Sequence, residues 1–234
     1  MAVHKPAFIH ETHLDTIKDV VNELQRLDKL LADTDLHQYQ LFNGAYFMIT
    51  SAVQRSVTED YFKNPKFIEK FIVTFASYYF TAINDTVSDS SELSVPWSKL
   101  NDYAKQKSAP KFVSLLLGAN AHINNDLPQV LKTLMEKENT EDLLSDIVKI
   151  DKLLMESGKQ IIGTFDETNK IVDLLKRHFQ FMYYRPAMYT IRYWRIIAWK
   201  NYRKLKKEQT AMQKITRRSI KIANRWLVVS KALS

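Results

Sequence analysis

One short stretch of the sequence gathers side chains that can carry a proton or hold a metal ion. Between Leu115 and Pro128 the sequence LLLGANAHINNDLP changes within a few residues from an apolar run to a cluster of one His, three Asn and one Asp. If the stretch is helical, His122 and Asp126 lie four residues apart on one face, with Asn125 beside them. A carboxylate next to an imidazole raises the basicity of the imidazole and fixes its tautomer.

Three interpretations of this stretch are open. In the first, the Asn and Asp side chains cap the end of one helix and the start of the next, and His122 is a hydrogen-bonded core residue. In the second, His122 and Asp126 are an acid/base pair. In the third, the same two residues bind a divalent metal ion, which would need further ligands from elsewhere in the chain. No sequence motif requires a cofactor, so the cofactor is unknown.

The composition and the apolar pattern predict an all-α protein. Only four Gly and six Pro occur in 234 residues, which favours long helices over a sheet protein with many turns. Apolar residues recur at helical spacing, and we expect a single-domain bundle of about seven or eight helices. Cys is absent, which excludes disulfides and thiolate chemistry.

Local signals predict where several elements begin and end. Thr12 followed by Asp15 resembles a capping box, so the first helix is expected to begin near Thr12. Asn64 and the Pro after it predict a cap and first turn for a later helix. The polar run 84–95 predicts a surface loop. Pro128 is expected to force the backbone out of helix soon after the central stretch.

Charge is distributed unevenly along the chain. From Lys176 onward there are 16 Lys and Arg and one acid, Glu208, which is a net charge of +15; the preceding residues carry 18 basic and 25 acidic side chains, a net charge of −7. We divide the domain into an acidic body, residues 1–186, and a basic C-terminal helix or helix pair, residues 187–234. Such asymmetry indicates either an acidic partner, such as an anionic membrane surface, or docking of the basic segment on the acidic body. Nucleic acid is not expected, because the aromatic residues fall on the apolar stripe and no nucleic-acid-binding motif is present.

Four stretches of the chain, GANAHINNDLP, FASYYFTAI, PWSKL and LLSDIVKIDKLL, carry a resemblance to a known family. They resemble an uncharacterised, mostly bacterial family of all-helical domains of unknown function, whose hallmark is an N-A-H-I-N-x-D-L segment. The similar region runs from about Gln40 to about Arg203. The family has no reaction to transfer, but the resemblance implies importance for His122, Asn124, Asp126, Trp97, Asp146, Asp151, Arg192 and Trp199.

The function we expect from the sequence is a small-molecule enzyme with His122 and Asp126 as its acid/base pair. The substrate is expected to be a small, largely apolar molecule, because Phe, Tyr and Leu surround the stretch far more than charged residues do. The residues expected to bind it are Trp97, Asn124, Asn125, Tyr79, Asp146, Asp151, Arg192 and Trp199.

The alternative is a non-catalytic protein that binds a membrane or lipid through its basic C-terminal helix. The N-terminus has no signal-peptide pattern, and no uncharged stretch is long enough to span a bilayer. We therefore expect a cytoplasmic protein, peripheral to the membrane under the alternative function. The sequence leaves the oligomeric state unknown.

Overall fold

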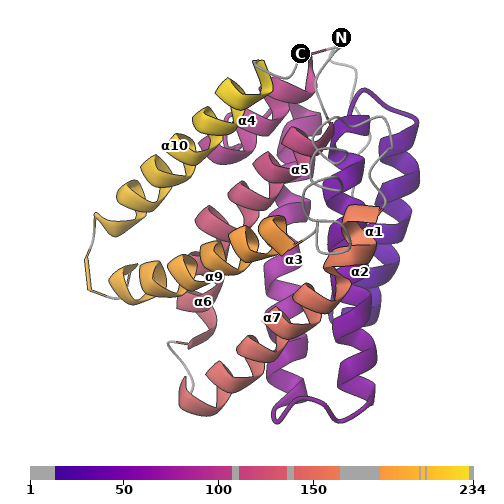
Figure 1. Cartoon of the computed structure of the whole chain (residues 1–234), viewed down its shortest axis with the longest axis vertical. Helices are drawn as coiled ribbons and strands as arrows, with labels where there is room; N and C mark the ends of the chain where they lie inside the picture. The colour runs from indigo at the N-terminus through magenta and orange to yellow at the C-terminus, as the bar shows by residue number, and fades with distance from the viewer. Residues whose placement is uncertain are drawn as a thin grey trace.

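The computed structural model describes residues 14–106, 111–135, 140–163, 185–205, 207–208 and 210–231. The elements are α1 (Ile17–Ala32), η1 (His37–Tyr39), α2 (Gln40–Thr58), α3 (Pro65–Ser88), α4 (Val95–Ala104), α5 (Lys111–Asn120), η2 (Ala121–Asp126), α6 (Leu127–Met135), α7 (Thr140–Gly163), α9 (Arg185–Leu205) and α10 (Ala211–Lys231) (Figure 1). The described residues are 87% helical and contain no strand, which confirms the all-α class. They form 8 helices when α5, η2 and α6 are counted as one and the short η1 is counted with α2. In these ranges no helix has both the length and the apolar character that crossing a membrane requires.

Helix α1 begins later than the sequence predicted. Thr16 is its N-cap: the Thr16 hydroxyl accepts a hydrogen bond from the Asp19 amide at 3.2 Å, and the Asp19 carboxylate accepts one from the Thr16 amide at 2.9 Å. The expected start near Thr12, which lies outside the described residues, is therefore wrong. The pattern Thr-x-x-Asp occurs twice in a row, and the second copy is the one that leads into the apolar stripe of α1.

Helix α3 has the predicted start but a later end. The Asn64 side chain accepts a hydrogen bond from the Phe67 amide at 3.1 Å, which confirms the predicted cap. The helix then continues to Ser88, so the predicted loop 84–95 is wrong in its first part. The hydroxyls of Thr86 and Ser88 donate to carbonyl oxygens four residues back, at 2.8 Å each, so these side chains are satisfied within the helix and do not compete with it.

The central helix runs through the middle of the protein without a break. Helix α5 continues through η2, a π-helical segment, directly into α6, and Pro128 lies inside α6 (Figure 1). The predicted break at Pro128 is therefore wrong. In η2 the Leu127 amide bonds to the His122 carbonyl five residues back, and this wider turn accommodates a Pro that an α-helical interior would exclude. Helices α3, α4, α9 and α10 pack against η2, and aromatic side chains of α2 also contact it.

The C-terminal basic segment forms two helices, the second of the two arrangements that the sequence left open. Helix α9 packs against η2 and α6, and α10 packs against α4, α5 and η2. The buried residues of α10 are small or aliphatic, and include Ser219 beside the central helix. The face of α9 that points away from the core carries the exposed side chains of Arg192, Lys200 and Arg203.

Candidate active site

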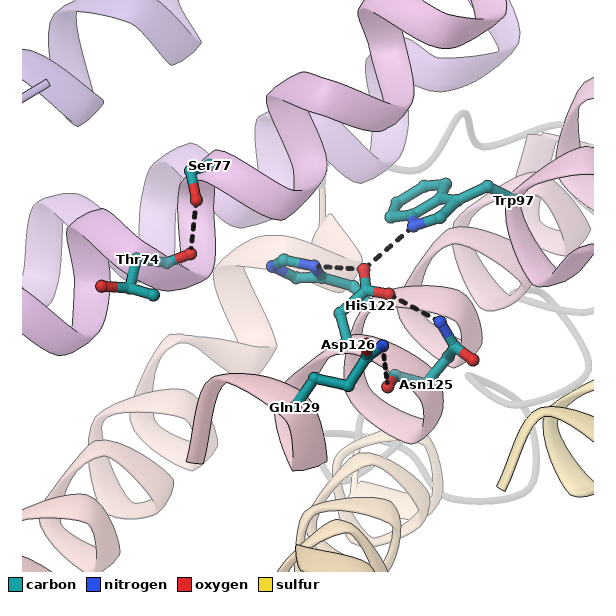
Figure 2. Close-up of polar contacts among 7 residues, drawn as sticks. All are labelled: Thr74, Ser77, Trp97, His122, Asn125, Asp126 and Gln129. Carbon is teal, nitrogen blue, oxygen red and sulfur yellow. Dashed lines mark hydrogen bonds and ion pairs between the residues drawn. The ribbon is translucent and has the colours of Figure 1, made fainter. Parts of the chain in front are cut away.

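Asp126 is the centre of a buried hydrogen-bond network. Its Oδ2 atom accepts a hydrogen bond from the Trp97 indole at 2.9 Å and lies 3.3 Å from Nδ1 of His122. Its Oδ1 atom accepts a hydrogen bond from the Asn125 side chain at 2.9 Å (Figure 2). An indole N–H and an amide NH₂ only donate, so both oxygens of Asp126 act as acceptors, as in an ionised carboxylate. Nδ1 of His122 therefore carries the proton, and Nε2 has the free lone pair.

The His122 ring is held in place by aromatic side chains. It stacks on Phe75 of α3, with ring centroids 3.6 Å apart and an interplanar angle of 5°. Phe42 and Tyr46 of α2 contact its edges with centroids 5.9 and 4.9 Å away. Figure 2 shows the ring between Asp126 and the α3 ribbon. Phe42 also packs on Gly118, where an added Cβ would come within 2.8 Å of the Phe42 ring, so only Gly leaves room for this arrangement.

Burial keeps His122 neutral. The side chain is almost completely inaccessible, and removing an imidazolium from water lowers the pKa of His122 below 6.5, although the hydrogen bond to Asp126 acts in the opposite direction. The positive charge of Arg195 lowers the same pKa further. At neutral pH the ring is thus a neutral imidazole whose Nε2 can accept a proton.

A second layer of hydrogen bonds fixes the amides around the pair. Asn125, which donates to Asp126, also accepts a hydrogen bond from the Thr216 hydroxyl of α10 at 3.1 Å, so both ends of its amide are engaged. Asn124 instead donates to Asn120 at 3.1 Å, and Asn120 donates to the backbone of Ser219 at 2.9 Å. Asn120 therefore joins the central helix to α10, and Asn124 supports Asn120 rather than Asp126.

His122 lines an apolar cavity of about 100 Å³, and its Nε2 atom is buried without a hydrogen-bond partner among the described residues. The lining comes from α2, α3, α5, η2, α7 and α9, and most of it is aliphatic or aromatic: Phe42, Ala45, Tyr46, Ile49, Phe75, Phe112, Leu115, Leu116, Ala119, His122, Ile123, Ile150, Leu154, Ile161, Ala187, Met188, Ile191 and Arg195. This volume is somewhat smaller than that of the ~150 Å³ cavity known to hold benzene, so it suits a ligand of a few heavy atoms.

Asp126 lines a second, polar cavity that His122 does not reach. This cavity is larger, about 280 Å³, and Trp97, Asn125 and Gln129 line it together with Asp126 and side chains of α3. Among them are Ser77, Tyr78, Thr81 and Asp85. Of the His122–Asp126 pair, His122 therefore lines the apolar cavity and Asp126 lines the polar cavity.

Three other predicted site residues do not line either cavity. Tyr79 is buried, and its hydroxyl donates to Asn43 at 3.4 Å, while its ring packs 5.6 Å from Trp97. Tyr79 thus contributes to the aromatic layer behind the site. Trp199 is half-buried on α9 and packs against Tyr202, with ring centroids 5.4 Å apart. Arg192, on the same helix, is exposed.

Asp151 reaches the apolar cavity only through another residue. Its carboxylate accepts a hydrogen bond from Nε of Arg195, and the two side chains form an ion pair that is largely buried. Arg195 itself lines the cavity. Asp151 is therefore a partner of a cavity residue.

Asp146 holds the connection between α2 and α3. Its fully buried carboxylate accepts hydrogen bonds from the amides of Lys63 and Asn64 at 3.0 and 2.7 Å and pairs with Lys149 at 3.1 Å. Burial alone would raise the pKa of Asp146, but the two amides and the ammonium group together hold it below its usual value of 3.8. Asp146 thus serves the fold and lies apart from His122.

We expect Asp146→Ala to lower the free energy of unfolding by about 2–4 kcal/mol, because two backbone N–H groups and the Lys149 ammonium lose a fully buried acceptor. A lowered pKa contributes stability above pH 3.8 that is lost as the pH falls through the folded-state pKa. The difference between wild type and variant should therefore shrink in acid. Urea melts at pH 7 and pH 3 measure it, and Glu156→Ala, on the exposed face of the same helix, is the control. A variant as stable as Glu156→Ala at pH 7 would contradict the capping role.

Among the described residues, no three His, Asp or Glu side chains come close enough together to hold a metal ion. His122 and Asp126 contribute at most two ligands, and their neighbours Trp97 and Asn125 turn N–H donors toward the carboxylate. This donor set fits an acid/base pair better than a metal site.

Sequence reasoning missed the two polar residues of the apolar cavity other than His122. Tyr46 belongs to an aromatic-rich stripe of α2, and nothing in the sequence distinguishes it from its neighbours. Arg195 offered a signal: it lies on the apolar stripe of α9, four residues after Ile191 and three before Ala198, both buried. A charged residue at such a position is rarely buried without a specific partner.

The model of the family of unknown function DUF5995 matches residues 17–230. The chain therefore belongs to this family, as the sequence resemblance implied. Searches of the curated proteins and of the solved structures give no significant match.

Proposed function

We propose that this member of the DUF5995 family is an enzyme that moves a proton to or from a small, largely apolar substrate. One observation carries the proposal: Nδ1 of His122 lies within hydrogen-bond distance of Asp126, whereas Nε2 of this cavity-lining residue is buried and has no hydrogen-bond partner among the described residues. A neutral imidazole that is oriented by a carboxylate at one nitrogen and open at the other is suited to act as a general base.

The neighbouring residues have distinct roles in this proposal. Asp126 is a positioning residue: it selects the tautomer with the proton on Nδ1 and stabilises the imidazolium that forms when Nε2 accepts a proton. Trp97 and Asn125 hold the carboxylate in place. Phe75 fixes the plane of the ring, and the apolar lining excludes water from Nε2.

The test is a search for a His122-dependent reaction. The full-length protein is incubated in D₂O with a panel of small uncharged molecules that carry acidic C–H groups or hydrolysable bonds, and ¹H NMR follows both product formation and exchange of hydrogen for deuterium. We expect at least one panel member to react with wild-type protein and not with His122→Phe. If every reaction proceeds equally with both proteins, His122 is not the base.

A second candidate function, binding to anionic membranes, is favoured by the outer face of α9. Tyr189, Tyr193 and Ile196 are 53%, 54% and 44% exposed and follow one another at helical spacing, with Arg192 and Lys200 beside them. Tyr side chains and basic residues on one face are typical of helices at a membrane surface.

Co-sedimentation with phosphatidylserine/phosphatidylcholine vesicles and with pure phosphatidylcholine vesicles tests this second function. Binding should require the anionic lipid and weaken as salt is added, and Arg192→Glu with Lys200→Glu should reduce it, because each basic residue contributes about 1 kcal/mol near such a surface. Equal recovery with both kinds of vesicle at low and high salt would rule out electrostatic membrane binding.

A further inference from the structure

Three residues that line the apolar cavity each have a buried polar atom with no hydrogen-bond partner among the described residues. These atoms are the hydroxyl of Tyr46, Nε2 of His122 and Nη2 of Arg195. All three residues are more than nine-tenths buried. A buried polar atom without a partner is unfavourable, and most so when it belongs to a charged group. Three such atoms on residues that line one small cavity favour a ligand that satisfies them together.

The chemistry of these atoms limits the kind of ligand. The Arg195 guanidinium can only donate hydrogen bonds. Burial strongly raises the pKa of Tyr46, so its phenol stays protonated and can donate as well. Nε2 of His122 accepts. A complementary molecule therefore has an oxygen that accepts hydrogen bonds from Arg195 and Tyr46. Next to this oxygen it has a C–H or other X–H group whose proton Nε2 can accept.

The charges already present in the site favour an uncharged carbonyl group over a carboxylate as the source of this oxygen. Arg195 is already paired with Asp151, and Asp126 lies behind His122. A carboxylate ligand would bring a third negative group to a buried site that contains one guanidinium, and an unbalanced buried charge is costly. A carbonyl oxygen accepts the same hydrogen bonds without adding charge.

We propose that the cavity binds a small uncharged carbonyl compound, with its oxygen bound by Arg195 and Tyr46 and its α-carbon next to Nε2 of His122. Binding of the carbonyl compound does not depend on the proposed function, whereas the reaction described next rests on it. In that reaction the C–H bond of the α-carbon breaks, its proton moves to Nε2, and the electron pair forms the C=C bond of an enolate. The negative charge on the oxygen is stabilised by the Arg195 and Tyr46 donors, and return of a proton to carbon restores the carbonyl.

Three ligands with one heavy-atom skeleton test the binding site: 2-pentanone, butanoate and 2-methyl-1-pentene. They present a neutral oxygen, a charged carboxylate and a CH₂ group at the same place. The ¹³C-methyl signal of Met188, which lines the cavity, reports binding in the full-length protein. We expect 2-pentanone to bind about tenfold or more tightly than either analogue. Equal or tighter binding of butanoate or of the alkene overturns the proposal, as does the absence of binding by all three.

Variants show whether the two donors are responsible. Tyr46→Phe should weaken 2-pentanone binding about tenfold and leave binding of the alkene and the melting temperature unchanged, because the lost hydroxyl has no partner in the described part of the chain. Arg195→Lys should act in the same direction, since the ammonium group lacks the planar fork. Tyr39→Phe is the matched control: Tyr39 is buried, and its hydroxyl lies 3.5 Å from Thr86, outside the cavity. Unchanged 2-pentanone binding by Tyr46→Phe and Arg195→Lys would overturn the proposal.

Two separate measurements distinguish the carbonyl-binding site from the proposed proton-transfer function. Deuterium incorporation at the α-carbons of 2-pentanone in D₂O reports proton transfer, whereas the Met188 signal reports binding. Tight 2-pentanone binding without His122-dependent exchange would keep the carbonyl site and remove the proton-transfer function. Exchange that needs His122 but not Tyr46 or Arg195 would keep the function and remove the carbonyl site.

Discussion

Replacing Asp126 by Ala should lower the free energy of unfolding by about 3–5 kcal/mol, the largest loss of stability that we expect from a single substitution in this site. The carboxylate accepts hydrogen bonds from Trp97 and Asn125 and faces the N–H of His122, and all three residues are buried. Without the carboxylate these buried donors lose their acceptor.

Urea melts at pH 7 measure this effect. Asp102→Ala is the matched control, because Asp102 lies on the exposed face of α4, the helix that also supplies Trp97. The control should change stability by less than about 0.5 kcal/mol. A loss for Asp126→Ala no larger than that of the control would mean that the network in the protein differs from the one described above.

Replacing His122 by Phe should lower the rate of the proton-transfer reaction by a factor of about 10²–10⁴, which is the usual contribution of a general acid or base. Phe keeps a ring to stack on Phe75, and Asp126 retains its bonds to Trp97 and Asn125. Stability should therefore fall much less than activity. A large drop in melting temperature together with unchanged activity per folded molecule would show that the histidine is structural.

The pH dependence of the rate gives a second readout of the same residue. A base is active when neutral, and the pKa of His122 is lowered by burial, so the wild-type rate should fall to half its maximum only at a pH below 6.5. Asp126→Asn should also reduce the rate, because an amide NH₂ facing Nδ1 would favour the tautomer with its proton on Nε2. A rate that falls already between pH 8 and 7 would point to another group.

The contact between His122 and Asp126 could be predicted from the sequence because it is local. Side chains four residues apart stay close in an α-helix and also in the π-helical segment that the chain forms here. The helix start at Asn64 was predictable for the same reason, since its cap involves residues three apart. Trp97 was implied by the family resemblance, but its hydrogen bond to a residue 29 positions later was not readable from spacing.

The remaining polar contacts depend on which helices become neighbours. Asp146 and Asp151 share helix α7, yet one binds backbone amides before α3 and the other binds Arg195 of α9. Their separation of five residues turns them to different sides, and only the tertiary structure decides what each side meets. Tyr46 was hidden for a related reason: a hydroxyl on a buried aromatic stripe becomes distinctive only when its partners can be counted in three dimensions.

The π-helical segment also limits how this chain can change in length during evolution. A turn closed over five residues contains one residue more than an α-helical turn, so η2 acts as an insertion that the fold has kept. Removing one residue between His122 and Asp126 would restore α-helical turns and leave α6 in nearly the same orientation relative to α5, because the wider turn accommodates the extra residue without rotating the helix that follows. Helix α6 would then still pack against α9 and α3, but His122 and Asp126 would lie three residues apart instead of four, and their contact would change. The extra residue therefore matters for the geometry of the site more than for the packing of α6.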